Sequence, residues 1–245
     1  MKSRWLVIVA IGLIICSFIG CLPNVPTEGE PEPADRVVMI ELFMAIGCGG
    51  CEVVEPILEQ LIEEYGFDKL ILVEEAGWGE YSTQEISDRY KWYLPDVSDR
   101  GVPNILFNGL NDRIHGSSSH QTIKNSIDAE LAKGAKIVIT ATRNGDANTT
   151  TISGNIENVS SSSLNNLVIN GMVFKEQEED DLKYVTFDIF EEQKKEISSL
   201  ESGESFNFSF TLEDTNWASD KVHGVIFVQS PYSSTKEILQ AYYIE

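Results

Sequence analysis

The chain has 245 residues, and its 39 acidic and 18 basic side chains give a formal net charge of −21. This charge argues against a nucleic-acid or anionic-surface partner, because phosphate binding needs a basic surface. Four cysteines are too few for a small scaffold held together by disulfides, so their positions are more informative than their number.

The first 35 residues have the pattern of an export signal followed by a tether. Lys2 and Arg4 precede an almost uninterrupted apolar run over residues 5–20, which is typical of a secretory signal. Residues 22–35 are rich in proline and acidic side chains and have no basic one. Such a segment cannot bury a core, and we expect an extended, self-repelling tether.

The end of the apolar run, Phe18-Ile19-Gly20-Cys21, resembles the lipobox of prokaryotic lipoproteins. The resemblance implies that Cys21 is lipidated and becomes the first residue of the mature chain. An uncleaved signal anchor is the alternative, because residues 5–22 approach the lower limit of ~17–25 residues for a membrane span. Soluble secretion is a third interpretation. All three place the rest of the protein outside the cytoplasm, and the first two anchor it to the membrane of the cell envelope.

Cys48 and Cys51 are then the only cysteines of the exported region, because Cys16 lies inside the apolar run. Residues 37–43 before the pair have the pattern of a buried strand, and residues 52–65 after it have apolar residues at helical spacing. The pair is therefore predicted at a strand-to-helix turn, where amide N–H groups and the helix dipole stabilise a thiolate. Cys48 is expected to attack and Cys51 to resolve the mixed disulfide.

Two other interpretations of the cysteine pair are a structural disulfide and half of a metal site. A bridge between residues three apart closes a very short loop and contributes roughly 2 kcal/mol, which is little for a chain of this size. A zinc site needs two further ligands, and His115, His120 and His223 are scattered single residues. We therefore expect redox chemistry, no metal and no diffusible cofactor.

The residues around the pair resemble the thioredoxin superfamily. Glu41-Leu42-Phe43 followed by CGGCEVVEPILEQLIEEYG is similar to the family's core strand, active-site turn and long helix, with Pro56 at the position of its helix-kinking proline. The segment GVPNILFNG at residues 101–109 is similar to its cis-proline loop. The resemblance covers residues 36–133. It implies that Pro103 is cis and packs opposite Cys48, and that the backbone at Val102 binds substrate.

The chain departs from the family pattern around the cysteines. Gly47 stands where the family usually has tryptophan, the dipeptide between the cysteines is Gly-Gly, and Glu52 replaces a basic residue. Glu41 is the candidate for the buried carboxylate that transfers protons for Cys51, although it lies one residue farther from Cys48 than the family's carboxylate does.

The remaining elements complete an α/β domain over residues 36–133. Residues 69–76 are predicted to form a strand, 82–93 a helix with an N-cap near its start, 113–116 a short strand and 117–133 a closing helix. With the strand of the cis-proline loop, the predicted order is β-α-β-α-β-β-α. The aromatic residues between 78 and 93 are expected to pack in the core, with a peptide groove beside Cys48 as the alternative.

Residues 134–245 are predicted to form a second, all-β domain. Apolar and polar residues alternate in about seven runs, which favours an immunoglobulin-like antiparallel sandwich. No catalytic constellation occurs in this region. The sequence thus predicts a membrane-anchored, extracytoplasmic thiol–disulfide oxidoreductase that acts on exported proteins. An unidentified redox partner is expected to return its cysteine pair to the starting oxidation state. A non-catalytic envelope lipoprotein, with the thioredoxin-like fold as a scaffold and the sandwich as a binding domain, is the alternative.

Overall fold

A computed structural model describes residues 34–145, 149–177, 182–213, 217 and 221–245. Residues 33–245 form one compact unit. The predicted signal, the lipobox cysteine Cys21 and the tether up to residue 33 lie outside the described residues. In the described part, no helix is long and apolar enough to cross a membrane.

The N-terminal half has the predicted order of elements. In chain order these are β1 (Val38–Met44), α1 (Cys51–Tyr65), β2 (Leu70–Ala76), α2 (Gln84–Tyr93), the short 3-10 helix η1 (Val97–Asp99), β3 (Asn104–Phe107), β4 (Asp112–His115) and α3 (His120–Leu131). Strand β1 pairs in parallel with β2 and antiparallel with β3, which pairs antiparallel with β4. The predicted strands and helices of this half are therefore confirmed.

The central strand β1 is buried on both faces. Val38, Ile40 and Leu42 pack against the apolar faces of α1 and α3, whereas Met39 and Phe43 pack against α2. Helices α2 and α3 begin at capping side chains: Thr83 accepts a hydrogen bond from the Ile86 amide, and Ser119 accepts one from the Thr122 amide.

The C-terminal half consists of strands. In chain order these are β5 (Ile137–Gly145), β6 (Thr149–Asn158), β7 (Leu164–Gln177), β8 (Leu182–Ile189), β9 (Lys195–Leu200), β10 (Ser205–Glu213), β11 (Val222–Gln229) and β12 (Ile238–Ile244). Strands β5, β6 and β10 form a separate antiparallel sheet, in the order β10-β6-β5. The other strands of this half belong to the same sheet as β1, in the order β12-β11-β7-β8-β2-β1-β3-β4, with β9 beside β7.

The link between the two halves was not expected from the sequence. Strand β8 pairs with β2 in parallel at Glu74 and Val185, so one mixed sheet runs through both halves. Within the C-terminal half the paired strands are antiparallel, as predicted. Alternation of apolar and polar residues indicates that a segment is a strand, but it does not indicate which strand is its neighbour.

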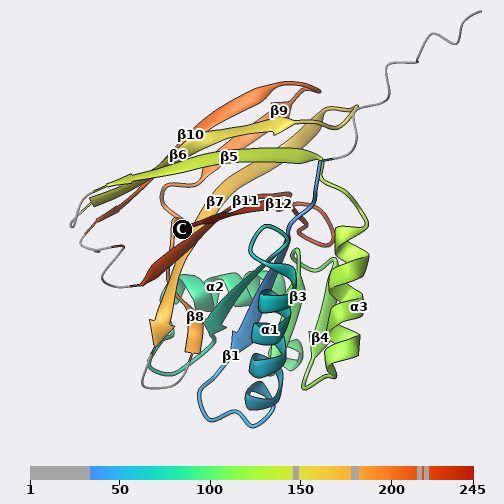
Figure 1. The fold of residues 1–245 in the computed structure, drawn as a ribbon, viewed down its shortest axis with the longest axis vertical. Helices are drawn as coiled ribbons and strands as arrows, with labels where there is room; N and C mark the ends of the chain where they lie inside the picture. The colour runs from blue at the N-terminus through green and yellow to red at the C-terminus, as the bar shows by residue number, and fades with distance from the viewer. Residues whose placement is uncertain (1–33, 146–148, 178–181, 214–216, 218–220) are drawn as a thin grey trace, which may run out of the picture. The chain divides into compact units, whose positions relative to one another are not determined.

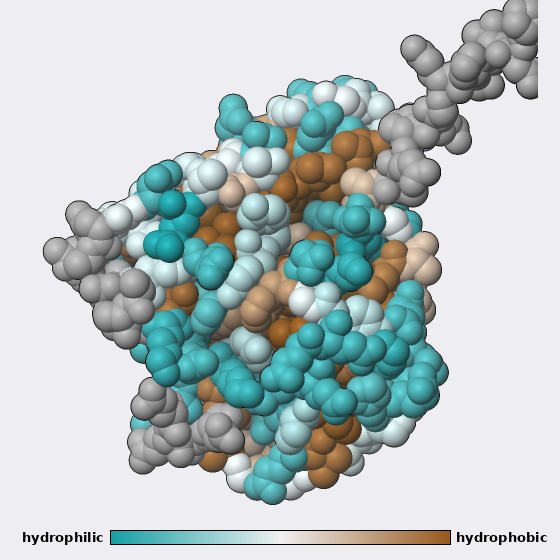
Figure 2. Space-filling model, in the orientation of Figure 1, coloured by the Kyte–Doolittle hydropathy of each residue, from teal (hydrophilic) through white to brown (hydrophobic). Residues whose placement is uncertain are grey.

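The elements stack in layers, which Figure 1 shows from the side. Helices α1 and α3 cover one face of the β1-β2-β3-β4 region, and their exposed surface is mostly hydrophilic (Figure 2). The opposite face packs against α2 and against β7, β11 and β12. The far side of those three strands packs in turn against β5, β6 and β10. The large sheet therefore bends so that its own two halves enclose a shared core.

Candidate functional site

The cysteine pair lies in the turn between β1 and α1, as predicted. Cys51 is the first residue of α1, and its amide lies 2.8 Å from the carbonyl oxygen of Cys48. The same amide also lies 3.3 Å from Cys48 Sγ, to which it donates a hydrogen bond. The two sulfurs are free thiols. A peptide N–H at the start of a helix thus faces the sulfur of Cys48, where it stabilises negative charge.

The loop before β3 lies opposite the cysteine turn. The peptide bond between Val102 and Pro103 is cis, which confirms the expectation for Pro103. Cys48 Sγ lies 3.7 Å from the carbonyl oxygen of Val102. A Cβ atom at Gly50 would lie only 2.9 Å from Pro103 Cδ, so the proline ring packs where a larger residue would clash. The structure therefore brings Cys48, Cys51, Val102 and Pro103 together.

The two thiols differ in their access to solvent. Cys48 is half-buried, whereas Cys51 is only 1 % exposed. Burial raises the pKa of Cys51 to about 12, and its interaction with the neighbouring Cys48 thiol adds to the shift. Cys48 is therefore the sulfur that a partner molecule can reach, and Cys51 lies behind it as a protonated thiol.

A small cavity of about 300 Å³ leads to Cys51 and is lined by residues 44–47, Glu52, Glu55 and Leu182. Glu55 follows Cys51 by four residues on the same face of α1. Burial, together with the charges of Glu59 and Glu52, raises the pKa of Glu55 to about 7. Although the sequence did not single out Glu55 as a site residue, its four-residue spacing from Cys51 within a helix was visible there.

Glu41 does not lie beside the cysteines. Its carboxylate accepts hydrogen bonds from Arg89 Nε and, at 2.7 Å, from the Tyr93 hydroxyl, both on α2. Successive side chains of a strand point to opposite faces, and Leu42 next to it faces the core under α1. The structure therefore does not bring Glu41 together with Cys51.

Glu74 is a buried carboxylate on the α1 side of the sheet. Its alternating neighbours Leu72 and Ala76 belong to the core under α1, and Glu74 accepts a hydrogen bond of 3.0 Å from the Tyr184 amide of β8. Burial raises the pKa of Glu74 to about 8. Within the described residues, no group of three or more His, Cys, Asp or Glu side chains is arranged to hold a metal ion.

Comparisons with known proteins show similarity in fold only. No family model and no curated protein matches this chain. The structure is similar to that of HBP35 of Porphyromonas gingivalis, with a TM-score of 0.68 and 14% identity over 86% of this chain and 75% of the other. It is also similar to protein AGR_C_4864 from Agrobacterium tumefaciens, with a TM-score of 0.59 and 16% identity over 85% and 94%. Both structural alignments cover most of this chain, so they include strands of both its sheets and show that this overall fold occurs in other proteins.

Proposed function

We propose that the protein is a thiol–disulfide oxidoreductase that acts on exported proteins. The observation that supports this most directly is the arrangement of the two cysteines opposite the cis-proline loop. A reachable Cys48 sulfur receives a helix-terminal N–H and faces the Val102 carbonyl beside Pro103, and the buried Cys51 thiol lies behind it. The order of elements and this site also support a thioredoxin-like arrangement for residues 36–133.

The chemistry is a two-step exchange. The Cys48 thiolate attacks a substrate disulfide, so that a bond forms between Cys48 and one substrate sulfur and the other substrate sulfur leaves as a thiolate. Cys51 then loses its proton and attacks Cys48 Sγ, which forms the Cys48–Cys51 disulfide and releases the second substrate thiolate. Two electrons pass from the cysteine pair to the substrate, and the reverse sequence oxidises a substrate dithiol. A protein redox partner then returns Cys48 and Cys51 to their starting oxidation state, and no diffusible cofactor is needed.

The surface around Cys48 fits a polypeptide substrate. The Val102 carbonyl is a main-chain acceptor beside the sulfur, and Ile46 and Val53 on either side of the pair are about half exposed. An extended substrate segment is expected to pair with the backbone at Val102 and to place apolar side chains on Ile46 and Val53.

The location and domain division of the protein also remain predictions. We infer that Cys21 carries a lipid that anchors the chain to the cell envelope, because the sequence of residues 1–21 has the pattern of a lipoprotein signal. The predicted domain boundary between residues 133 and 134 rests on a change in the elements: helices and strands alternate before it, and only strands follow it. Antiparallel pairing and a core between two layers support the predicted immunoglobulin-like sandwich, whereas the pairing of β8 with β2 ties it to the first half.

Exchange activity tests this proposal. We expect the purified chain to catalyse insulin reduction or oxidative refolding, and the Cys48→Ser variant to be inactive. The Cys51→Ser variant is expected to accumulate a mixed disulfide at Cys48, because the neighbouring thiol that would resolve it is missing. Wild-type activity no higher than that of Cys48→Ser would contradict the proposal.

The alternative is a non-catalytic envelope protein in which the same fold serves as a scaffold. The acidic side chains of Glu52 and Glu55 beside Cys51 favour it, because negative charge opposes thiolate formation. In that case wild type and both cysteine variants would be equally inactive in the exchange assays.

A further inference from the structure

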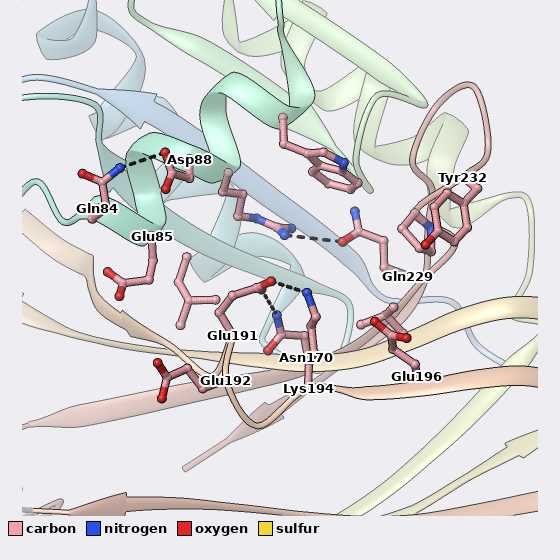
Figure 3. A pocket seen from close by; sticks show the side chains of 15 residues that line it. Gln84, Glu85, Asp88, Asn170, Glu191, Glu192, Lys194, Glu196, Gln229 and Tyr232 are labelled. Carbon is pink, nitrogen blue, oxygen red and sulfur yellow. Dashed lines mark hydrogen bonds and ion pairs between the residues drawn. The ribbon is translucent and has the colours of Figure 1, made fainter.

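A second and larger cavity lies away from the cysteine pair. It has a volume of about 560 Å³ and is lined by α2, β7, the turn between β8 and β9, and the turn after β11 (Figure 3). This volume falls within the ~300–1,000 Å³ range of sites that hold small molecules. None of Cys48, Cys51, Val102 and Pro103 lines it.

The floor of the cavity is polar and held in place by hydrogen bonds. The side chains of Asn170 and Gln229 are 3 % and 4 % exposed. Asn170 donates to Glu191 at 3.1 Å, and Gln229 accepts from Arg89 at 3.4 Å. The partly buried Arg89 is itself bound to Glu41 on β1. The floor is therefore preformed and rigid.

Two aromatic rings contribute to the apolar surface of the cavity, together with Val168, Ile189 and Pro231. Trp92 of α2 and Tyr232 of the turn after β11 both line it, and they remain 36 % and 82 % exposed. The aromatic cluster of the sequence is thus divided, because Tyr90 and Tyr93 are in the core, as predicted, whereas Trp92 faces the cavity. Exposed rings at the wall of a preformed cavity offer a surface for an apolar stem or for a cation.

The charge of the lining is negative. Five carboxylates line the cavity, whereas Arg89 and Lys194 are its two cationic side chains. Arg89 is neutralised by Glu41, and Lys194 by Glu191. Three of the carboxylates, those of Glu85, Glu192 and Glu196, have no hydrogen-bond or ion-pair partner among the described residues. The cavity therefore carries uncompensated negative charge at these three carboxylates, whereas the Trp92 ring lies under Arg89 and under Lys236 Nζ, which is 4.9 Å from the ring centroid.

We propose that this cavity binds a small organic cation, namely an amine or guanidinium compound with an apolar stem. The cationic group lies among the three free carboxylates, and the stem packs against Trp92 and Tyr232. An anionic ligand is excluded by repulsion, and a neutral ligand leaves the three free carboxylates without a counter-charge. The site is independent of the thiol chemistry.

Calorimetric titration of the full chain with agmatine at low ionic strength tests the proposal. Agmatine carries a guanidinium and an ammonium group on a four-carbon stem. We expect one molecule to bind per chain, with an affinity that falls as salt is added. The Glu192→Gln/Glu196→Gln double variant should weaken binding about tenfold, because two nearby charges are removed. Tyr232→Ala should also weaken it several-fold, and its exposed ring leaves the fold intact.

The control is a double variant that removes two exposed carboxylates elsewhere, Glu63→Gln/Glu157→Gln. It makes the net charge of the chain less negative by the same amount, and we expect unchanged binding. Equal weakening by the two double variants would overturn the proposal, because it would indicate a diffuse ion atmosphere. Absence of binding, or tighter binding of maltose as a neutral probe, would also overturn it. Cys48→Ser should bind agmatine as the wild type does, so failure of the exchange assay leaves this test unaffected.

Discussion

Cys48 and Cys51 are chemically different although only two residues separate them. Cys48 receives an amide hydrogen bond and is half-buried, whereas Cys51 is buried and its pKa is raised to about 12. At pH 8 a thiol with that pKa is a thiolate in about one molecule in ten thousand. These environments support the order of steps in the proposed exchange, with attack by Cys48 and resolution by Cys51.

Alkylation of the native, reduced chain tests this difference. We expect iodoacetamide at pH 8 to modify Cys48 at least about tenfold faster than Cys51, because Cys51 is buried and its raised pKa keeps it protonated. Peptide mapping by mass spectrometry separates the two sites from Cys16 and Cys21. The Cys48→Ser variant should leave Cys51 unmodified until urea is added. Equal rates at both thiols in the native chain would contradict the assignment.

At the scale of single residues, the sequence predicted the site where its chemistry is local. Cys48 and Cys51 lie in a short segment whose residue types indicate a turn and a helix start, and the resemblance of residues 101–109 to a cis-proline loop placed Pro103 opposite them. Glu41 was the candidate for proton transfer to Cys51, but it contacts Arg89 instead. One position along a strand moves a side chain to the other face, so this placement depended on a register that was not known.

At the scale of elements, β2 lies between β1 and β8 and contains two buried carboxylates. Glu74 bonds the backbone of β8 at Tyr184, whereas Glu75 faces the core around α2, where burial and the nearby Glu41 raise its pKa well above the usual value. Neither residue was predicted as buried, because pairing of β2 with β8 joins segments more than a hundred residues apart. Such pairing has no local signal in the sequence.

Glu74 is expected to make the protein less stable as the pH rises. Its pKa is about 8 in the folded chain and about 4.5 in the unfolded chain, so between these values the folded state keeps a proton that the unfolded state has lost. One such group lowers the free energy of unfolding by at most about 1.4 kcal/mol per pH unit. Glu74→Gln removes this dependence and still accepts the Tyr184 hydrogen bond.

Urea denaturation at pH 5 and pH 8 measures the effect. The Glu74→Gln variant should match the wild type near pH 5 and exceed it in stability at pH 8. The stability of the variant still falls with pH, but less steeply, because Glu55 and Glu75 also have raised pKa values. The exposed Glu63→Gln change serves as the control and should alter neither value. If the free energy of unfolding of Glu74→Gln fell between pH 5 and pH 8 as much as that of the wild type, the role of this carboxylate would be contradicted.

At the scale of the whole molecule, the two halves share a core. Met39, Phe43, Ile71 and Val73 of β1 and β2 are fully buried, in a cluster that also includes side chains of β7, β11 and β12. The large cavity is a product of the same arrangement, since its residues come from both halves. Local patterns in the sequence predicted the elements of each half but neither this core nor the cavity.

Removal of residues 134–245 is expected to abolish cooperative folding of the N-terminal half. It would expose the four side chains named above, each of which contributes roughly 1.5–3 kcal/mol when buried, against a total stability of roughly 5–15 kcal/mol. Thermal unfolding followed by circular dichroism, with the full chain as the reference, measures this. A sharp transition in residues 1–133 near that of the full chain would instead support an autonomous domain ending at residue 133.

The start of the folded part has a mechanical consequence. The guanidinium group of Arg36 bonds Glu130 of α3, Glu237 and the carbonyl oxygen of Ile238 in β12, and the carbonyl of Ala34 accepts a bond from Ala135. A pulling force on the N-terminus therefore acts first on these contacts, which join the start of β1 to α3 and β12. It loads the parallel β1–β2 hydrogen bonds in shear, many at once, rather than opening them one by one.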